Sequence, residues 1–360
     1  MPAIATWAHF LRGIILLLAL SPLVLAQSKG GARSGTKKTL GRDLCIAHYN
    51  VENLFDTLDD PTVNDQDFLP SSPMAWGEAR YYHKIGQISN LIAHMNRGST
   101  PDFLGICEIE NQRVLQDLLG QPALRKSNLA FIHSESKDPR GIDVALLYNK
   151  TLFKPFARWD LPIALPGDSS SPTRPILVVS GRLLSGDTLH FLVNHWPSRR
   201  GGNEKSAPNR YAAARRLRQA VDSLFTRYGG PERSFLVITG DFNDTPLDPS
   251  IRLLLGADSS SSRGLFHPWA GLEGGSYCYQ DRWEWLDQII LSQGFVPQSK
   301  DAKTLHYIPG SASAHTDSTL RQQEGKFKGY PFRTYAGNRY LGGPSDHLPV
   351  HLYLRCPSCP

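Results

Sequence analysis

The sequence predicts an α/β protein with mixed β-sheets. Apolar, strand-like runs recur throughout residues 43–355, and helical segments separate some of them while hairpin-like connections separate others. With 360 residues, of which 40% are hydrophobic, the chain can bury one large core or two small ones. Residues 43–355 contain no internal repeat and no clear linker, so we expect one domain there. The pattern does not give the order of its strands.

The first elements are predicted from apolar runs that alternate with polar loops. Leu44–Asn50 has the composition of a strand, and a loop rich in Pro, Asp and Ser follows at Asp59–Gly77. Apolar residues then recur at helical spacing over Tyr81–Met95. Asp102–Cys107 predicts a second strand, and Asn111–Leu119 predicts a short helix.

Strands dominate the rest of the domain, with one long helix among them. The helix is predicted over Pro208–Tyr228, with proline in its first turn and two glycines after its end. The predicted strands are Ile142–Tyr148, Ile176–Leu183, Leu189–Asn194, a run that begins at Phe235, Leu286–Leu291 and Leu348–Leu354. Gly310–Gly343 is rich in loop residues and long enough to suggest a functional insertion.

The N-terminus has the order of a secretory leader. Arg12 precedes the apolar run Gly13–Leu20, and small residues lie before a cleavage site at Ala26. We therefore expect a signal peptide over residues 1–26, with an anchored N-terminal helix as the alternative, and a secreted or periplasmic protein without stable membrane insertion after cleavage. Residues 27–42, rich in Gly, Ser, Lys and Arg, are expected to be a flexible basic linker.

Net charge and cysteine content restrict the function only weakly. The formal charge is +6, but residues 1–42 hold six basic residues and no acid, so the remainder is formally neutral. Five cysteines are too few for a disulfide scaffold. Cys356 and Cys359, in the tail over residues 356–360, are expected to form a local disulfide or an idle tail, whereas Cys45 and Cys107 are expected to be buried.

Polar side chains gather where the predicted strands end or begin. Asp241 and Asn243 directly follow the strand in FLVITGDFND. Similar positions hold His48, Asn50, Glu108, His195, Asp287, Asp346 and His347. Each alone is a common turn residue. Together, these carboxylates, amides and imidazoles could hold a hard divalent cation and leave histidines for proton transfer.

Eight motifs occur in a characteristic order along the domain. They are NVENLF (50–55), ICEIEN (106–111), RGIDVALLY (140–148), TRPIL (173–177), NHWPSR (194–199), GDFND (240–244), WLDQII (285–290) and SDHLPV (345–350). In these motifs the sequence resembles the endonuclease/exonuclease/phosphatase family, which includes pancreatic-type deoxyribonucleases, exonuclease III and neutral sphingomyelinases. The resemblance implies a catalytic domain over residues 43–355 with a four-layer α/β sandwich, in which helices flank two packed mixed β-sheets.

The resemblance also implies a metal site and a site for the attacking water. Glu108 and Asp346 are expected to bind Mg²⁺, with Asn50 beside it, and Mn²⁺ or Ca²⁺ remain alternatives. Asp241 is expected to orient or activate the attacking water. Asn243 is expected to donate to the phosphoryl oxygens.

Two imidazoles are implied as well. His347 matches the family's catalytic histidine, with Asp287 as its carboxylate partner, and such a pair fixes the tautomer and raises the histidine pKa. His195 matches the second histidine, a candidate to protonate the leaving oxygen or to hold a phosphate. Asp138 or Asp143 is a further candidate to orient His195.

Basic residues supply the expected phosphate contacts. Arg174 matches the arginine that grips a phosphate oxygen. Arg199 and Arg210, from the basic segment at 199–218, are the further candidates, and an ordinary solvated helix face is the alternative. Glu52 could assist a second metal, but we interpret it as a solvated loop acid.

These expectations combine into a secreted, Mg²⁺-dependent phosphodiesterase. The leading hypothesis is a monomeric endonuclease with DNA or RNA as its substrate. The alternatives are a phosphohydrolase that acts on phospholipid head groups or phosphoinositides, and an inactive binding module on the same fold. The loops at 59–77, 258–283 and 310–343 are expected to set the substrate.

Overall fold

The computed structural model describes residues 41–166, 173–258, 260, 262–297 and 303–359, all within one unit, Thr39–Pro360. The predicted signal peptide and most of the predicted linker lie outside the described residues. The boundaries of the domain differ slightly from the prediction, because Arg42 already begins the first strand and Cys356 ends the last one.

The first β-sheet is mixed and has seven strands. The order of six is β14-β18-β1-β2-β4-β3, and β15 also pairs with β18. β1 and β2 are parallel, whereas the other pairs are antiparallel. Their bounds are β1 Arg42–Leu54, β2 Phe103–Ile109, β3 Leu129–Ser134, β4 Asp143–Asn149, β14 His306–Tyr307, β15 Ser313–Ala314 and β18 Val350–Cys356.

The second β-sheet is also mixed, with the order β5-β6-β7-β8-β13-β10-β9. β7 and β8 are parallel, as are β9 and β10. The bounds are β5 Phe153–Leu161, β6 Ile176–Leu183, β7 Thr188–His195, β8 Phe235–Asp241, β9 Ala257–Asp258, β10 Leu265–Phe266 and β13 Asp287–Ser292.

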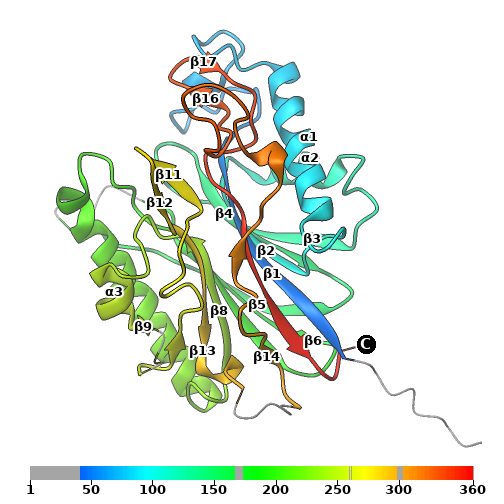
Figure 1. Cartoon of the computed structure of the whole chain (residues 1–360), viewed down its shortest axis with the longest axis vertical. Helices are drawn as coiled ribbons and strands as arrows, with labels where there is room; N and C mark the ends of the chain where they lie inside the picture. Colours follow the sequence, from blue (N-terminus) through cyan, green and yellow to red (C-terminus); the bar gives the residue numbers. More distant parts are fainter. Residues whose placement is uncertain (1–40, 167–172, 259, 261, 298–302, 360) are drawn as a thin grey trace, which may run out of the picture. The chain divides into compact units, whose positions relative to one another are not determined.

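Helices cover the outer faces of both sheets and complete four layers (Figure 1). α1 (Glu78–His94) and α2 (Gln112–Gly120) pack on the first sheet, and α3 (Asn203–Tyr228) packs on the second together with the π-helix η2 (Ser250–Leu255). Apolar side chains of the two sheets fill the space between them, with Phe103 stacked on Phe191. The predicted sandwich is thus confirmed.

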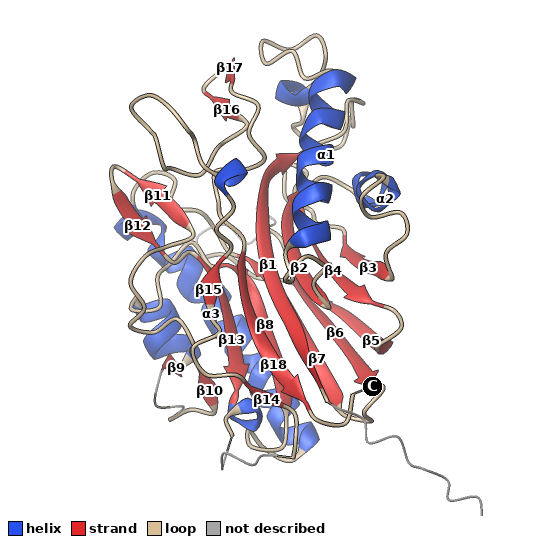
Figure 2. Ribbon diagram, turned by 45° about the vertical axis from the view of Figure 1, so that its right-hand side comes forward, coloured by secondary structure: helices blue, strands red, loops and turns tan. Residues whose placement is uncertain are grey.

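Two small hairpins lie beyond one end of the sheets (Figure 2). β11 (Tyr277–Tyr279) and β12 (Arg282–Glu284) form one hairpin, and β16 (Tyr335–Ala336) and β17 (Arg339–Tyr340) form another. Three 3₁₀ helices lie in loops, namely η1 Gln66–Phe68, η3 Gln293–Phe295 and η4 Ser318–Leu320. Among the residues that the structure describes, no helix is long and apolar enough to cross a membrane.

Two predictions about individual elements were incomplete. β3 and β5, the outermost strands at one edge of each sheet, were not predicted. α3 begins at Asn203, five residues before the predicted start, and Pro208 lies inside it rather than in the first turn. The cysteine predictions hold, since Cys356 and Cys359 form a buried disulfide and Cys45 and Cys107 are buried free thiols.

Candidate active site

Glu108 reaches the site because a bulge interrupts the first sheet at the end of β2. The ladder between β2 and β4 skips from Cys107 to Ile109. Glu108 has a φ of 62°, in the left-handed region that costs a non-glycine residue roughly 1–2 kcal/mol. Its Oε2 accepts from the backbone N–H of Asn53 at 2.9 Å, and its Oε1 accepts from Nδ2 of Asn50 at 3.2 Å. The bulge therefore turns this carboxylate out of the sheet and fixes it.

The second sheet contributes three residues in register. Asp241 ends β8 and lies between His195 on parallel β7 and Asp287 on antiparallel β13. Asn243 follows with a φ of 52°, and its backbone N–H donates to Oδ1 of Asp241 at 2.9 Å. One side-chain N–H of Asn243 donates to the carbonyl of Trp196 at 3.0 Å, which leaves the other for a ligand.

Asn50 connects the two sheets at this edge. Its Nδ2 donates to Oε1 of Glu108 at 3.2 Å and to Oδ2 of Asp241 at 3.1 Å, and its Oδ1 accepts from the backbone N–H of Glu52. In this structure Asn50 therefore holds the two carboxylates together through its Nδ2. Its Oδ1 accepts one hydrogen bond and keeps a second lone pair, so its expected place beside a metal stays a prediction.

His347 and Asp287 form a buried pair. Nδ1 of His347 lies 2.6 Å from Oδ2 of Asp287, and the ring of Tyr277 packs on the imidazole with 4.9 Å between ring centroids. Burial alone would lower the pKa of His347, but the charge and hydrogen bond of Asp287 raise it well above its ordinary value. Likewise, burial acts to raise the pKa of Asp287, but the charge of His347 outweighs it and lowers the pKa. At neutral pH the pair is therefore an imidazolium and a carboxylate.

His195 has the opposite electrostatic environment. Its Nε2 lies 3.6 Å from Oε1 of Glu108 and 3.7 Å from Oδ2 of Asp241, while its Nδ1 is buried without a hydrogen-bond partner among the described residues. Burial, followed by the charge of Arg174, lowers the pKa of His195 well below its ordinary value. His195 is therefore neutral at pH 7.

The expected partners of His195 are engaged elsewhere. Asp138 forms an ion pair with Arg174, whose other terminal nitrogen donates to the carbonyl of Trp196. Arg174 is buried, and these two contacts brace the segment beside His195, while its Nε has no hydrogen-bond partner among the described residues. The expected roles of Asp138 towards His195 and of Arg174 towards a phosphate stay predictions.

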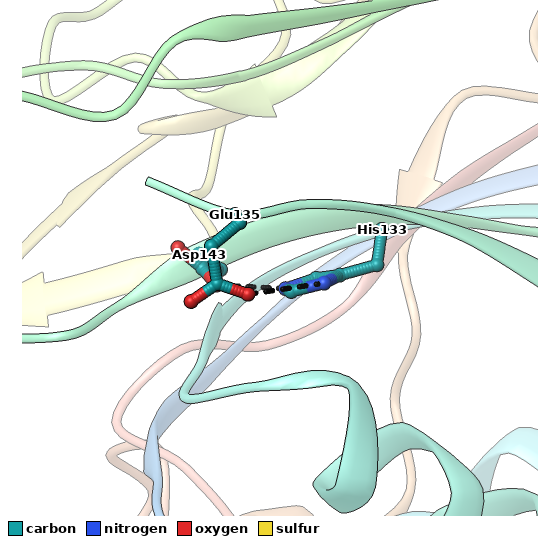
Figure 3. A group of neighbouring side chains, drawn as sticks. All are labelled: His133, Glu135 and Asp143. Atoms are coloured by element: carbon teal, nitrogen blue, oxygen red, sulfur yellow. Dashed lines mark hydrogen bonds and ion pairs between the residues drawn. The ribbon is translucent and has the colours of Figure 1, made fainter. Parts of the chain in front are cut away.

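Asp143 belongs to a separate cluster with His133 and Glu135 (Figure 3). Its Oδ2 lies 2.7 Å from Nε2 of His133, and its Oδ1 accepts from the backbone N–H of Ser136. Glu135 is exposed, and its Oε2 lies 3.8 Å from Nδ1 of His133. Both carboxylate oxygens of Asp143 are used, so the prediction that it orients His195 is wrong. The cluster fixes the loop between β3 and β4.

The site has the charge and donor chemistry that a divalent cation requires. Glu108 and Asp241 face each other across Asn50 without a lysine or arginine partner among the described residues. Burial raises the pKa of Asp241 to about 6, and the charge of Asp287 adds to this effect. A bound cation would relieve this concentration of negative charge, and carboxylate oxygens are the ligands that Mg²⁺ prefers.

Two sets of side chains could meet a metal ion. Asp241, Asp287 and His347 have ligand atoms within 4.8 Å of one another, and the last two already bind each other. Glu108 and Asp346 have side chains that are 14% and 23% exposed, so they can meet a cation that keeps several waters. Their role as metal ligands stays a prediction.

The other two arginines that were predicted to contact a phosphate form ion pairs with acidic residues. Arg199 donates to the carbonyl of Asn243 at 2.7 Å and to Oε2 of Glu284 at 2.8 Å. Arg210 is 1% exposed, and its Nε lies 2.6 Å from Oδ1 of Asp244. Arg199 positions Asn243, and Arg210 is a buried structural cation, so neither presents a free guanidinium to a phosphate. The alternative prediction, that these basic residues form an ordinary solvated helix face, is also wrong for Arg210.

Two basic residues near the site were missed in the sequence. Glu52, expected to be a solvated acid, is buried and accepts from the backbone N–H of Thr334, while Nζ of buried Lys84 donates to the Glu52 carbonyl and to Oγ1 of Thr334. Arg333 donates to Oδ2 of Asp346 at 2.8 Å. The sequence signal for Lys84 is its place on the apolar stripe of α1; loop 310–343 offered none for Arg333.

Comparison with solved structures shows the same fold. A zebrafish (D. rerio) TDP2, humanized by 14 mutations, is 15% identical, with a TM-score of 0.53 over 87% of this chain and 98% of that one. Mannosyl-6-phosphatase Bt3783 of Bacteroides thetaiotaomicron is 18% identical, with a TM-score of 0.53 over 86% and 99%. The human Nocturnin catalytic domain, with bound sulfate, is 16% identical, with a TM-score of 0.52 over 87% and 93%.

Comparison of sequences assigns the family. A search of curated proteins found no match. The model of the endonuclease/exonuclease/phosphatase family matches residues 45–356, which are most of the chain and hold every residue of the site described above. Enzymes of this family generally depend on a divalent metal, in agreement with the acidic centre. The chain therefore belongs to the endonuclease/exonuclease/phosphatase family.

Proposed function

We propose that this protein is a secreted, divalent metal-dependent phosphodiesterase that hydrolyses nucleic acid. The observation that carries the hydrolytic part is the convergence of Glu108 and Asp241, held by one amide, with a charged His347–Asp287 pair. Glu108 and Asp346 would hold the metal ion, which when bound polarises a phosphoryl oxygen.

The remaining groups divide the proton transfers between them. Asp241, with a pKa of about 6, is suited to accept a proton from the attacking water near neutral pH. Asn243 offers an amide N–H to a phosphoryl oxygen. His347, held protonated by Asp287, is suited to donate to the phosphate or the leaving oxygen. His195 is neutral, so its proposed role is to orient the bound substrate and not to transfer a proton.

Nucleic acid is the proposed substrate because one solved structure with the same fold is zebrafish TDP2 complexed with a single-stranded DNA product. That relative is 17% identical, so the substrate rests on analogy of fold. The mannosyl-6-phosphatase has the same fold, so a sugar phosphate is the alternative to include in the test.

Hydrolysis of plasmid DNA, single-stranded DNA, RNA, sphingomyelin, a phosphoinositide and mannose 6-phosphate, with and without chelator, tests the proposal. We expect cleavage of nucleic acid that chelator abolishes and Mg²⁺ restores. Glu108→Gln should abolish turnover, while the exposed Glu232→Gln, at the opposite end of β8, should match wild type. Full activity in excess chelator would refute the metal requirement, and exclusive hydrolysis of a lipid or sugar phosphate would refute the substrate.

Export is proposed from two observations. The leader-like segment over residues 1–26 precedes the domain, and the Cys356–Cys359 disulfide suits an oxidising compartment. N-terminal sequencing of protein from the native host should find a chain that begins near Gln27. A cytoplasmic chain that still begins at Met1 would contradict export.

A further inference from the structure

A cavity of about 760 Å³ opens beside the candidate active site. Residues of the β11–β12 hairpin form one wall, and residues 322–341, which carry β16 and β17, form the other. Arg333 and Asp346 line it, so it reaches one of the two proposed metal-binding carboxylates. The volume is in the range of small-ligand sites.

The two walls are clasped together. Oη of Tyr330 donates to Oδ1 of Asp281 at 2.6 Å and accepts from the backbone N–H of Asp281 at 2.7 Å. Gln280 and Asp281, the two turn residues of the hairpin, have φ values of 49° and 63°. Positive φ at both residues is what a two-residue hairpin loop requires. The two hydrogen bonds between Tyr330 and Asp281 therefore fix this hairpin against the opposite wall.

Aromatic rings and two cations line this space. Tyr279 and Phe327 are 60% and 47% exposed, and Nζ of Lys326 lies 5.6 Å from the centroid of the Phe327 ring. Within the described part of the chain, no acidic group lies within ion-pair distance of Lys326 or Arg339. The two acids of the cavity are engaged, because Asp281 binds Tyr330 and Asp346 binds Arg333.

We propose that this cavity binds a nucleotide unit attached to the scissile phosphate, an inference that rests on the proposed function. Its base stacks on Tyr279 or Phe327, and its outer phosphate meets Lys326 and Arg339. Aromatic faces supply stacking that tolerates any base, and paired cations complement a second phosphate.

Matched substrates isolate the base from the phosphate. The substrates are a dinucleotide with a terminal phosphate, the same dinucleotide without it, and an abasic analogue that keeps the phosphate. The Tyr279→Ala, Phe327→Ala double variant should raise KM for the base-containing substrates about 5- to 100-fold, with little change in kcat or in abasic hydrolysis. Lys326→Ala with Arg339→Ala should raise KM only for the substrates that bear a terminal phosphate.

The control is Phe156→Ala, since Phe156 is 55% exposed on β5 and does not line the cavity. Unfolding temperatures identify any variant that fails to fold, and the single variants then replace the double. If wild type cleaves dinucleotides and the cavity variants behave like Phe156→Ala, or lose base-containing and abasic activity equally, the cavity inference fails alone. If wild type cleaves only mannose 6-phosphate, the proposed function fails and this inference fails with it.

Discussion

Replacement of Asn50 by Asp tests whether the centre carries uncompensated negative charge. The change is almost isosteric, but it converts the amide that donates to Glu108 at 3.2 Å and to Asp241 at 3.1 Å into a carboxylate. At an effective dielectric constant of about 20, two unit charges at such distances repel by about 5 kcal/mol. The new carboxylate would meet two such neighbours in the folded state and none in the unfolded chain.

Proton uptake limits the cost of this repulsion. A carboxyl group with an ordinary pKa near 4 takes up a proton at pH 8 for roughly 5 kcal/mol, since each pH unit is worth about 1.4 kcal/mol. A carboxyl group whose pKa rises on folding destabilises the folded protein at pH values above its pKa in the unfolded chain. Below that unfolded pKa the destabilisation vanishes. We therefore expect Asn50→Asp to lose about 5 kcal/mol at pH 8 in chelator, and the loss to shrink by about 1.4 kcal/mol per unit as pH falls towards 4.

Urea denaturation in chelator, at pH 8 and pH 5, measures this loss. Asn50→Leu is the uncharged control, because it removes the same two hydrogen bonds, together with the one that Oδ1 accepts from Glu52, without adding charge, and its deficit should depend much less on pH. Mg²⁺ should stabilise Asn50→Asp more than wild type, because the extra carboxylate raises the affinity for a cation. Wild-type stability of Asn50→Asp at pH 8 in chelator would refute the charge argument.

Three further variants test neighbouring features. Asp287→Asn should lower kcat by roughly tenfold or more and lower the pKa of His347. The His347–Asp287 ion pair stabilises the folded protein fully below the pKa of the unfolded histidine. This stabilisation is lost as pH rises through the raised pKa of folded His347, so the stability of the variant should not show this decline at alkaline pH. A wild-type pH profile would contradict the pairing. Cys356→Ser should destabilise by about 2 kcal/mol, as expected for a short loop, and dithiothreitol should cause the same loss only in wild type. Arg210→Ala should destabilise by about 3–5 kcal/mol because Asp244 stays buried without its partner, whereas exposed Arg215→Ala should change stability by less than about 0.5 kcal/mol. Equal effects of the two arginine variants would contradict a buried role for Arg210.

The sequence predicted the central strands because both of their faces are buried. β7 and β8 read as nearly continuous apolar runs, and the structure buries almost all of their residues. β5 was missed because Pro155 and alternating charges interrupt it, and most of its side chains are exposed at the sheet edge. An edge strand is stabilised by pairing with its neighbour in the sheet, and the local sequence pattern does not indicate this pairing.

The site was predicted through residue type and motif order, and the errors concern what each residue contacts. Asn50 was expected beside a metal, which stays a prediction, and the sequence did not show that its Nδ2 donates to Asp241 while its Oδ1 accepts from the N–H of Glu52. The shape of the cavity depends on Tyr330 meeting Asp281, which lies 49 residues earlier in the chain. Contacts between distant loops of this kind leave no periodicity to detect.

Two of the buried cations, Lys84 and Arg210, could have been predicted, and they explain how the outer layers support the site. Lys84 shares the apolar stripe of α1 with Ile85 and Ile88, and Arg210 shares that of α3 with Ala213 and Leu217. A cation at such a position must find a buried partner, because an unpaired charge in the core costs several kcal/mol.

Each cation finds that partner at a strand-end loop. Lys84 binds the carbonyl of Glu52, whose φ is 48°, and Arg210 binds Asp244, which follows Asn243 at a φ of 52°. Left-handed backbone at non-glycine residues persists only where the surroundings hold it. A side chain of α1 thus fixes the strained backbone next to Asn50. A side chain of α3 fixes the strained backbone at Asn243. The side chains that hold the catalytic carboxylates therefore depend on charges buried one layer away.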